Sequence, residues 1–328
     1  MPGASELGTK AKADPLRGYL LALLAAVCWA TGGLTAKWLF TSPSAATAAW
    51  PIVPLGIRIE PTTLSGARAL SAFVLLALVL AVGRPRDLRI SRRDVPFLAV
   101  FGVFGLALVH YTYFKTISLT NVATAILLEY LAPVIVLLVG VAFMKHKFTW
   151  WLPVGVALSI GGSALVVGAV GGEGLVVSPA GIAWGLLSAV LFAAYTLMGT
   201  VAATRFSPYT ALVWGLGFAS IFWLIVLKPG VVLGAFADPK AAAAIVFIAV
   251  VSTIVPFAAF LIALHHIAPT NATVTSTVEP VIAGVGAYVL FGESLTAIQI
   301  VGGVMVVAAI AVVQLSERSP APTLPPQD

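Results

Sequence analysis

The sequence predicts an all-α membrane protein with ten transmembrane helices, arranged as two inverted five-helix repeats around a central cavity. Three observations carry this prediction. Of the 328 residues, 60% are hydrophobic and only 9% are charged, and the mean hydropathy is +1.06. Ten apolar stretches are each long enough to cross a bilayer, which takes about 20 residues of helix. The last five stretches repeat features of the first five.

The composition excludes several classes of protein. Soluble domains carry about 25% charged residues, so this chain cannot supply a polar coat. The apolar runs are continuous, whereas the strands of a transmembrane β-barrel alternate. With a single cysteine, Cys28, an intrachain disulfide is impossible. The sequence shows no metal-ligand spacing, phosphate-binding loop or catalytic signature. We therefore expect no metal, no cofactor, no nucleic-acid partner and no enzymatic activity.

The expected spans follow one another with short connections. In chain order they are 18–39, 61–83, 96–117, 121–144, 150–170, 180–203, 209–228, 242–264, 271–291 and 297–315. The polar segment 1–17 lacks a signal-peptide cleavage pattern. The apolar run 18–39 after it is long enough to span, so this run is interpreted as a retained first helix. The proline-rich segment 316–328 is expected to be a disordered tail.

Lysine and arginine set the orientation, because they are enriched on the cytoplasmic side of membrane proteins. Twelve lie in the N-terminal segment, the tail and the loops after spans 2, 4 and 6, whereas only Arg58, Lys228 and Lys240 lie in loops on the other side. We therefore expect a multi-pass protein of the cytoplasmic membrane with both termini in the cytoplasm.

The two halves resemble each other at fixed offsets. Residues 18–30 align with 181–193 at an offset of 163, whereas later landmarks such as Pro133 and Pro280 pair at an offset of 147. The difference of 16 residues places an insertion in the first half, within the outer segment 40–60. We therefore expect a first repeat over 18–170 and a second over 180–315. Because five spans per repeat is an odd number, the second repeat is inverted, which is an architecture of transporters.

Several stretches resemble a known family. They are Ala123–Pro133, Val278–Val281, Leu290–Thr296 and Arg68 early in the second span. Together they are similar to the EamA-type permeases of the drug/metabolite transporter superfamily. The resemblance implies a cavity built by spans 1–4 and 6–9, with spans 5 and 10 at the periphery. It also implies export of small metabolites, often amino acids or related compounds. The chain departs from the family pattern at His146, where such permeases carry Glu, and in the outer insertion.

The function expected from these features is secondary active transport by alternating access. The solute is a small molecule such as an amino acid, the direction is export, and protons are the candidate coupling ion. The protein is expected to work as a monomer in the lipid bilayer. The alternatives are uptake of a different small solute and a membrane-embedded enzyme.

Ionisable residues inside spans are costly and point to function. The helical rise places Glu129, Arg68 and His110 roughly 10–12 Å below the outer surface. Glu129 and Arg68 have two interpretations, a buried ion pair or a substrate-binding layer. Glu279 is either a proton carrier or anchor for a substrate ammonium, or a neutral hydrogen-bonded acid. His110 is a candidate proton relay or a satisfied polar residue.

Interior aromatic residues and prolines complete the candidate set. The aromatic candidates for lining the cavity are Trp29, Tyr130, Tyr195 and Trp214, and their alternative role is packing against helices or lipid. The candidate hinges are Pro133, Pro256 and Pro280, because proline removes a helix hydrogen bond.

Overall fold

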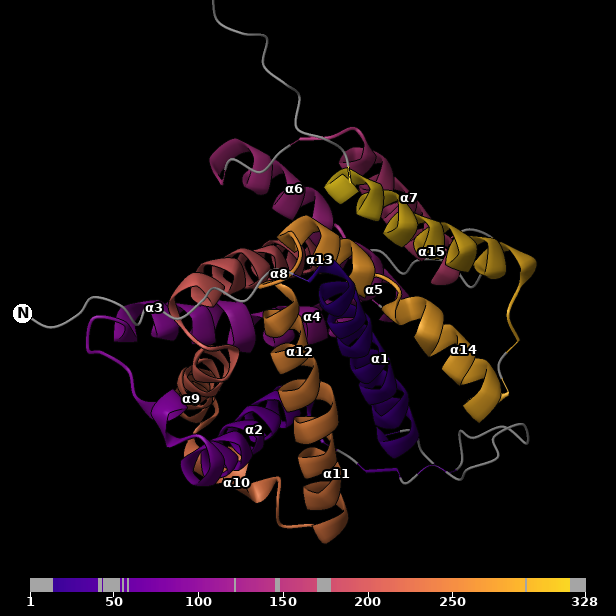
Figure 1. Cartoon of the computed structure of the whole chain (residues 1–328). Coiled ribbons are helices and arrows are strands. Elements are labelled where there is room, and N and C mark those ends of the chain that lie inside the picture. The colour runs from indigo at the N-terminus through magenta and orange to yellow at the C-terminus, as the bar shows by residue number, and fades with distance from the viewer. Residues whose placement is uncertain are drawn as a thin grey trace, which may run out of the picture.

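The computed structural model describes residues 14–40, 43, 54, 56–57, 59–120, 122–144, 148–169, 178–292 and 294–318, and its regular elements are helices (Figure 1). Within those ranges, nine helical spans are long and apolar enough to cross a membrane, and a tenth apolar helix is shorter. The all-α membrane fold is thus confirmed. Most of the expected outer insertion, the segments 1–13 and 319–328, and the residues His146 and Glu293 lie outside the described residues.

Within the described residues, the first repeat holds nine helical segments, of which η2 is a short 3-10 turn. They are α1 (Pro15–Phe40), α2 (Pro61–Gly83), η2 (Pro85–Leu88), α3 (Val95–Val100), η3 (Phe101–Ala107), α4 (Leu108–Leu119), α5 (Val122–Glu129), α6 (Ala132–Phe143) and α7 (Trp151–Val166).

The second repeat follows the same order. Its segments are α8 (Pro179–Arg205), α9 (Pro208–Leu227), α10 (Pro229–Gly234), α11 (Pro239–Ala249), η4 (Val250–Ile254), α12 (Val255–Ala263), α13 (Pro269–Ser276), α14 (Glu279–Phe291) and α15 (Ala297–Arg318). The last helix continues to Arg318, into the segment expected to be a disordered tail.

Prolines and serines begin many of these helices. Proline occupies the first turn of α2, α8, α9, α11 and α13, where its missing N–H would have no partner within the helix. The Ser178 hydroxyl accepts a hydrogen bond from the Gly181 N–H at 3.0 Å, and Ser207 accepts one from Thr210 at 3.1 Å. These caps satisfy N–H groups that the helix itself leaves free.

Two spans expected as continuous α-helices contain a π-helical segment. The third span runs through α3, η3 and α4, and the eighth through α11, η4 and α12. The two π segments end at Ala107 and Ile254, which are 147 positions apart and therefore equivalent in the repeat. Pro256 is the second residue after η4, and its missing N–H is one cause of the widened turn there.

Two further spans are interrupted at equivalent positions. The break between α5 and α6 lies at Tyr130 and Leu131, and that between α13 and α14 lies at Thr277 and Val278, again 147 positions on. The cause is a proline in the second position of α6 and of α14. Pro133 and Pro280 have no N–H to donate to the carbonyl groups four residues earlier, on Glu129 and Ser276.

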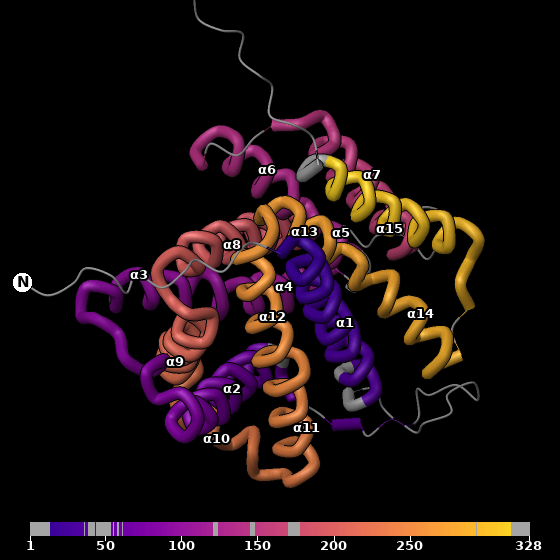
Figure 2. The backbone as a smooth tube through the Cα atoms, in the orientation of Figure 1, coloured from indigo at the N-terminus to yellow at the C-terminus, as the bar shows by residue number. Residues whose placement is uncertain are grey.

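The fifth and tenth spans, α7 and α15, pack together at one side of the molecule (Figure 2). Their backbones approach closely, because a Cβ added at Gly162 would lie 2.7 Å from the Gly302 oxygen, and one at Gly302 would lie 2.6 Å from the Gly162 oxygen. The helix α7 has 16 residues, fewer than the expected span 150–170, and a left-handed Gly168 (φ 76°) follows it. The predicted peripheral position of both spans is confirmed.

The chain direction defines two faces. Ten crossings bring both chain ends to one face, here called the terminal face, and the Asp14 N–H donates to His266 Nδ1 there at 3.2 Å. The start of α2 and the end of α1 lie at the opposite face. These two faces position the cavity described next.

Candidate functional site

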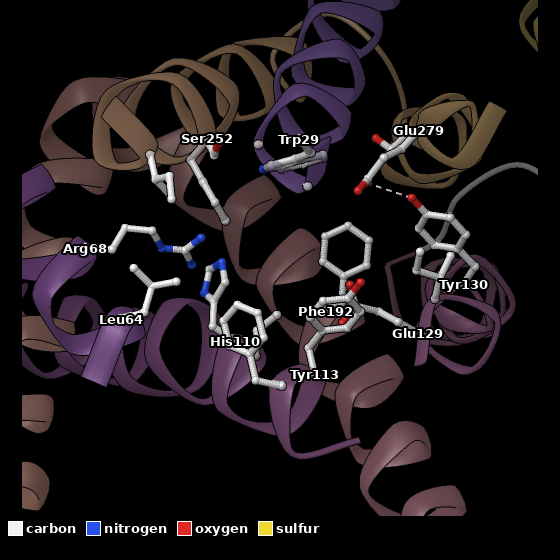
Figure 3. Close-up of a pocket in the computed structure, with 18 of the residues that line it drawn as sticks. Trp29, Leu64, Arg68, His110, Tyr113, Glu129, Tyr130, Phe192, Ser252 and Glu279 are labelled. Atoms are coloured by element: carbon white, nitrogen blue, oxygen red, sulfur yellow. Dashed lines mark hydrogen bonds between the residues drawn. The ribbon is translucent and has the colours of Figure 1, made fainter. Parts of the chain in front are cut away.

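A cavity of about 250 Å³ lies between the two repeats (Figure 3). Among the described residues, its lining comes from the first, second, third, fourth, sixth, eighth and ninth spans. The lining uses the second half of α1, the first turns of α2 and the end of the third span, all of which lie from the middle of the bundle toward the face opposite the chain ends. The cavity therefore belongs to that side of the molecule.

One end of the cavity is acidic. The Tyr130 hydroxyl donates to Glu279 Oε2 at 2.8 Å, which joins the break in the fourth span to the break in the ninth. The carboxylate of Glu129 accepts a hydrogen bond from the Ser188 hydroxyl of α8. Glu129 and Glu279 interact electrostatically with each other and with Tyr113. The two helix breaks thus bring two carboxyl groups to one place.

The other end carries the positive charge. Arg68 on α2 is 9% exposed, and Figure 3 shows its guanidinium group beside the ring of His110. The Nδ1 atom of His110 lies 2.7 Å from the Leu106 carbonyl oxygen, which can only accept, so Nδ1 carries a proton. Within the described part of the chain, Arg68 forms no ion pair. Arg68 and Glu129 therefore do not form an ion pair in this structure.

Aromatic rings separate the two ends. The His110 ring lies 5.5 Å from Phe257, measured between ring centroids, and Phe257 lies 5.5 Å from Trp29. Trp29 in turn contacts Phe192 at 6.2 Å. These rings form an apolar wall along the cavity.

Toward the terminal face, the bundle is closed by packed aromatic residues. Tyr195 is fully buried and stacks on Phe101 and Phe260, with ring centroids 5.7 Å away in each case. Nearer the chain ends, in the first turns of α13 and α1, the Asn271 side-chain amide donates to the Tyr19 hydroxyl at 2.9 Å. Solute in the cavity would have to displace this cluster to reach the terminal face.

Six of the eight residues predicted to bind substrate or protons line the cavity. They are Glu279, Glu129, Arg68, His110, Tyr130 and Trp29. Tyr195 lies below the cavity in the aromatic cluster. Trp214 lies away from it, where its Nε1 donates to the Leu88 carbonyl oxygen at 3.3 Å.

The sequence interpretation missed four contributors: Ser188, Tyr113, Phe192 and Phe257. The repeat alignment held a signal for two of them. Phe192 is equivalent to Trp29 at the offset of 163, and Phe257 is equivalent to His110 at the offset of 147. No comparable signal pointed to Ser188, whose role depends on its contact with Glu129.

The described lining of the cavity offers charged and aromatic groups. Among the described His, Cys, Asp and Glu residues, no group of three could hold a metal ion. The lining has a cationic side chain at one end and carboxyl groups at the other. This arrangement suits the reversible binding of a small organic solute.

Comparison with known proteins identifies the family. The EamA-like transporter family matches the chain over residues 16–168 and again over 179–315. The chain belongs to the EamA-like transporter family. It is thus a multi-pass membrane transporter, with a small-molecule substrate and the lipid bilayer as its partners. The predicted membership of the drug/metabolite transporter superfamily is confirmed.

Individual relatives support the family assignment. An uncharacterized inner membrane transporter of Salmonella typhimurium is 23% identical, over 92% of this chain and 96% of its own. A probable terminal-alkyne amino-acid exporter of Streptantibioticus cattleyicolor is 26% identical, over 81% of this chain and 88% of its own. A crystal structure with 20% identity covers 92% of this chain and 97% of its own, with a TM-score of 0.72, and it shows the same fold.

Proposed function

We propose that this transporter exports a small metabolite, such as an amino acid or a related compound, across the cytoplasmic membrane by alternating access. The observation that carries the proposal is the cavity at the interface of two inverted repeats, with Arg68 at one end and two carboxyl groups at the other. Such a site matches a solute that bears both charges. The relative named as an amino-acid exporter supports the same solute class.

The orientation follows from the distribution of positive charge. Arg84, Arg86 and Arg89 follow α2, and Arg205 ends α8, all on the terminal face. If that face is cytoplasmic, as the positive-inside rule favours, the cavity belongs to the outer side. The described conformation is then outward-facing, and the cluster around Tyr195 is the closed inner barrier. Movement of the two repeats about the broken helices would open the opposite side.

Glu279 is the proposed site of proton exchange. It faces Tyr130, Glu129 and Tyr113, and the lining residue His110 lies at the far end of the cavity. Its carboxyl group stands at the first position of α14, directly at a break that motion of the repeats would change. When the cavity is open to water, the carboxyl group can release its proton. A positively charged solute group can then take the proton's place.

The experiment uses purified protein in proteoliposomes with a panel of amino acids and related metabolites. Transport that responds to an imposed pH gradient is expected for the native protein. The variant Glu279→Gln should remain folded and lose the response to the gradient, because an amide resembles the protonated acid. The exposed Glu60→Gln is the matched control and should keep it. A normal pH profile in Glu279→Gln would remove Glu279 as the coupling site.

The same panel tests the alternatives. Export and uptake are distinguished by loading solute on each side of vesicles of known orientation. The proposed working state is a monomer, and cross-linking at low protein density tests that state. Chemical conversion of any panel compound would favour the membrane enzyme instead. The proposal itself assigns no catalytic residue.

A further inference from the structure

The charges of the cavity stand apart rather than together. Arg68 and His110, on α2 and α4, occupy one end (Figure 3). Glu129 and Glu279 stand at the helix breaks of α5 and α14, with Trp29, Phe192 and Tyr113 between the two groups in the view. A ligand that uses both ends must carry its own charges at a distance from each other.

The distances between neighbouring rings also show that the two ends of the cavity lie apart. His110 contacts Phe257 at 5.5 Å, Phe257 contacts Trp29 at 5.5 Å, and Trp29 contacts Phe192 at 6.2 Å. Phe192 lies one helical turn after Ser188, the residue that binds Glu129. A continuous row of rings therefore leads from the basic end to the acidic end.

Among the described residues, the basic end has no counter-charge. Arg68 is more than nine-tenths buried, and the described residues give its side chain neither an ion pair nor a hydrogen bond. A buried charge without a partner is costly, so an anionic ligand group would be stabilising there. The planar guanidinium fork matches the two oxygens of a carboxylate. At the other end, carboxyl groups match an ammonium.

We propose that the cavity selects zwitterions whose carboxylate and ammonium groups are joined by an apolar chain, the class of ω-amino acids. The carboxylate lies against the Arg68 guanidinium group, and the ammonium lies between Glu129 and Glu279. The apolar chain lies along the rings. An α-amino acid carries both groups on one carbon and reaches only one end. This inference rests on the proposed function, because it assigns the solute class of the same cavity.

Two isomers provide the decisive probes. The compounds 6-aminohexanoate and norleucine contain the same atoms, but only the first separates its charges. In purified protein, 6-aminohexanoate should raise the melting temperature and bind more tightly than norleucine, by at least tenfold in Kd. Hexanoate and hexylamine, which keep one charge each, should bind less well than 6-aminohexanoate. The homologues 4-aminobutanoate and 8-aminooctanoate then locate the preferred spacing.

Variants assign each end. In Arg68→Gln, 6-aminohexanoate should bind no better than hexylamine, whereas Arg68→Lys should retain part of the preference. In the double variant Glu129→Gln with Glu279→Gln, it should bind no better than hexanoate. The exposed Arg86→Gln serves as the control for a lost positive charge and should behave like the native protein.

Two results would overturn the inference: norleucine binding as tightly as its isomer, or failure of every ω-amino acid to bind folded native protein. Proteoliposome flux separates this outcome from the fate of the proposed function. Selective binding without flux contradicts transport alone. Flux of α-amino acids without a preference for separated charges contradicts the assignment to ω-amino acids alone.

Discussion

The two repeats share a backbone but not a chemistry. Their helix breaks and the ends of their π segments fall at equivalent positions, each pair 147 residues apart. The charged residues that line the cavity have no such symmetry. At the offset of 147, Arg68 is equivalent to Gly215, His110 to Phe257, and Glu129 to Ser276.

This contrast separates the scaffold from the binding chemistry. Equivalent rings meet each other, since Trp29 contacts Phe192 and His110 contacts Phe257. The axis relating the repeats therefore passes through the cavity. Two matching backbones allow the molecule to open to either side in turn. The solute, however, is asymmetric, and one set of charges suffices to bind it.

Replacing a symmetry-breaking charge should have the largest effect on transport. Charge-assisted hydrogen bonds contribute about 1.5–3 kcal/mol, so Arg68→Gln should weaken solute binding roughly 10- to 100-fold. Because no carboxylate pairs with Arg68 in the described structure, the melting temperature should not fall. Titration calorimetry and thermal melts check both statements. Strong destabilisation would show a structural role instead.

Replacing symmetric scaffold residues should act on stability. Gly302 and Gly155 are equivalent, but a Cβ at Gly302 meets backbone atoms of α7, including the Gly162 oxygen at 2.6 Å, whereas one at Gly155 first meets the Val313 side chain. Gly302→Ala should therefore cost about 1–3 kcal/mol, and Gly155→Ala less. Melting temperatures of the two variants provide the measurement. An equal loss would contradict this difference between the repeats.

The smallest effect is expected at the break itself. Tyr130→Phe removes one hydrogen bond to Glu279, worth about 0.5–1.5 kcal/mol, and should shift the pH profile of transport. Its equivalent, Thr277, donates only to its own helix, to the Val274 carbonyl oxygen. Thr277→Ala should leave the profile unchanged. Identical profiles in both variants would mean that the Tyr130 bond does not bear on proton exchange.

Much of the fold could be predicted from the sequence. Local hydropathy locates the spans, and matching positions in the two halves locate the repeats. The breaks were foreseeable at Pro133 and Pro280, since proline lacks the N–H that a helix needs. The π segments were not, because Phe101–Ala107 reads as an ordinary apolar helix. Pro256 accounts for part of the second π segment, but no proline stands at the equivalent position after the first one, in α4.

The candidate site was predictable in membership but not in arrangement. Glu279, Glu129, Arg68 and His110 were identifiable because charge inside a span is costly. Which of them meet depends on the rotation of each helix about its axis, and helical rise gives only depth. The helical rise predicted that Arg68 and Glu129 lie at a similar depth in the membrane. The structure instead pairs Glu129 with Ser188.

One-sided access to the cavity tests the central claim most directly. Gly33 lines the cavity, and a Cβ added there meets nothing within 4 Å. In a Cys28→Ser background, Gly33→Cys should react in intact cells with a membrane-impermeant thiol reagent, and saturating solute should slow the reaction. Arg89→Cys, on the terminal face, should react only after permeabilisation. Protection of residue 33 with ready labelling of residue 89 in intact cells would contradict the account.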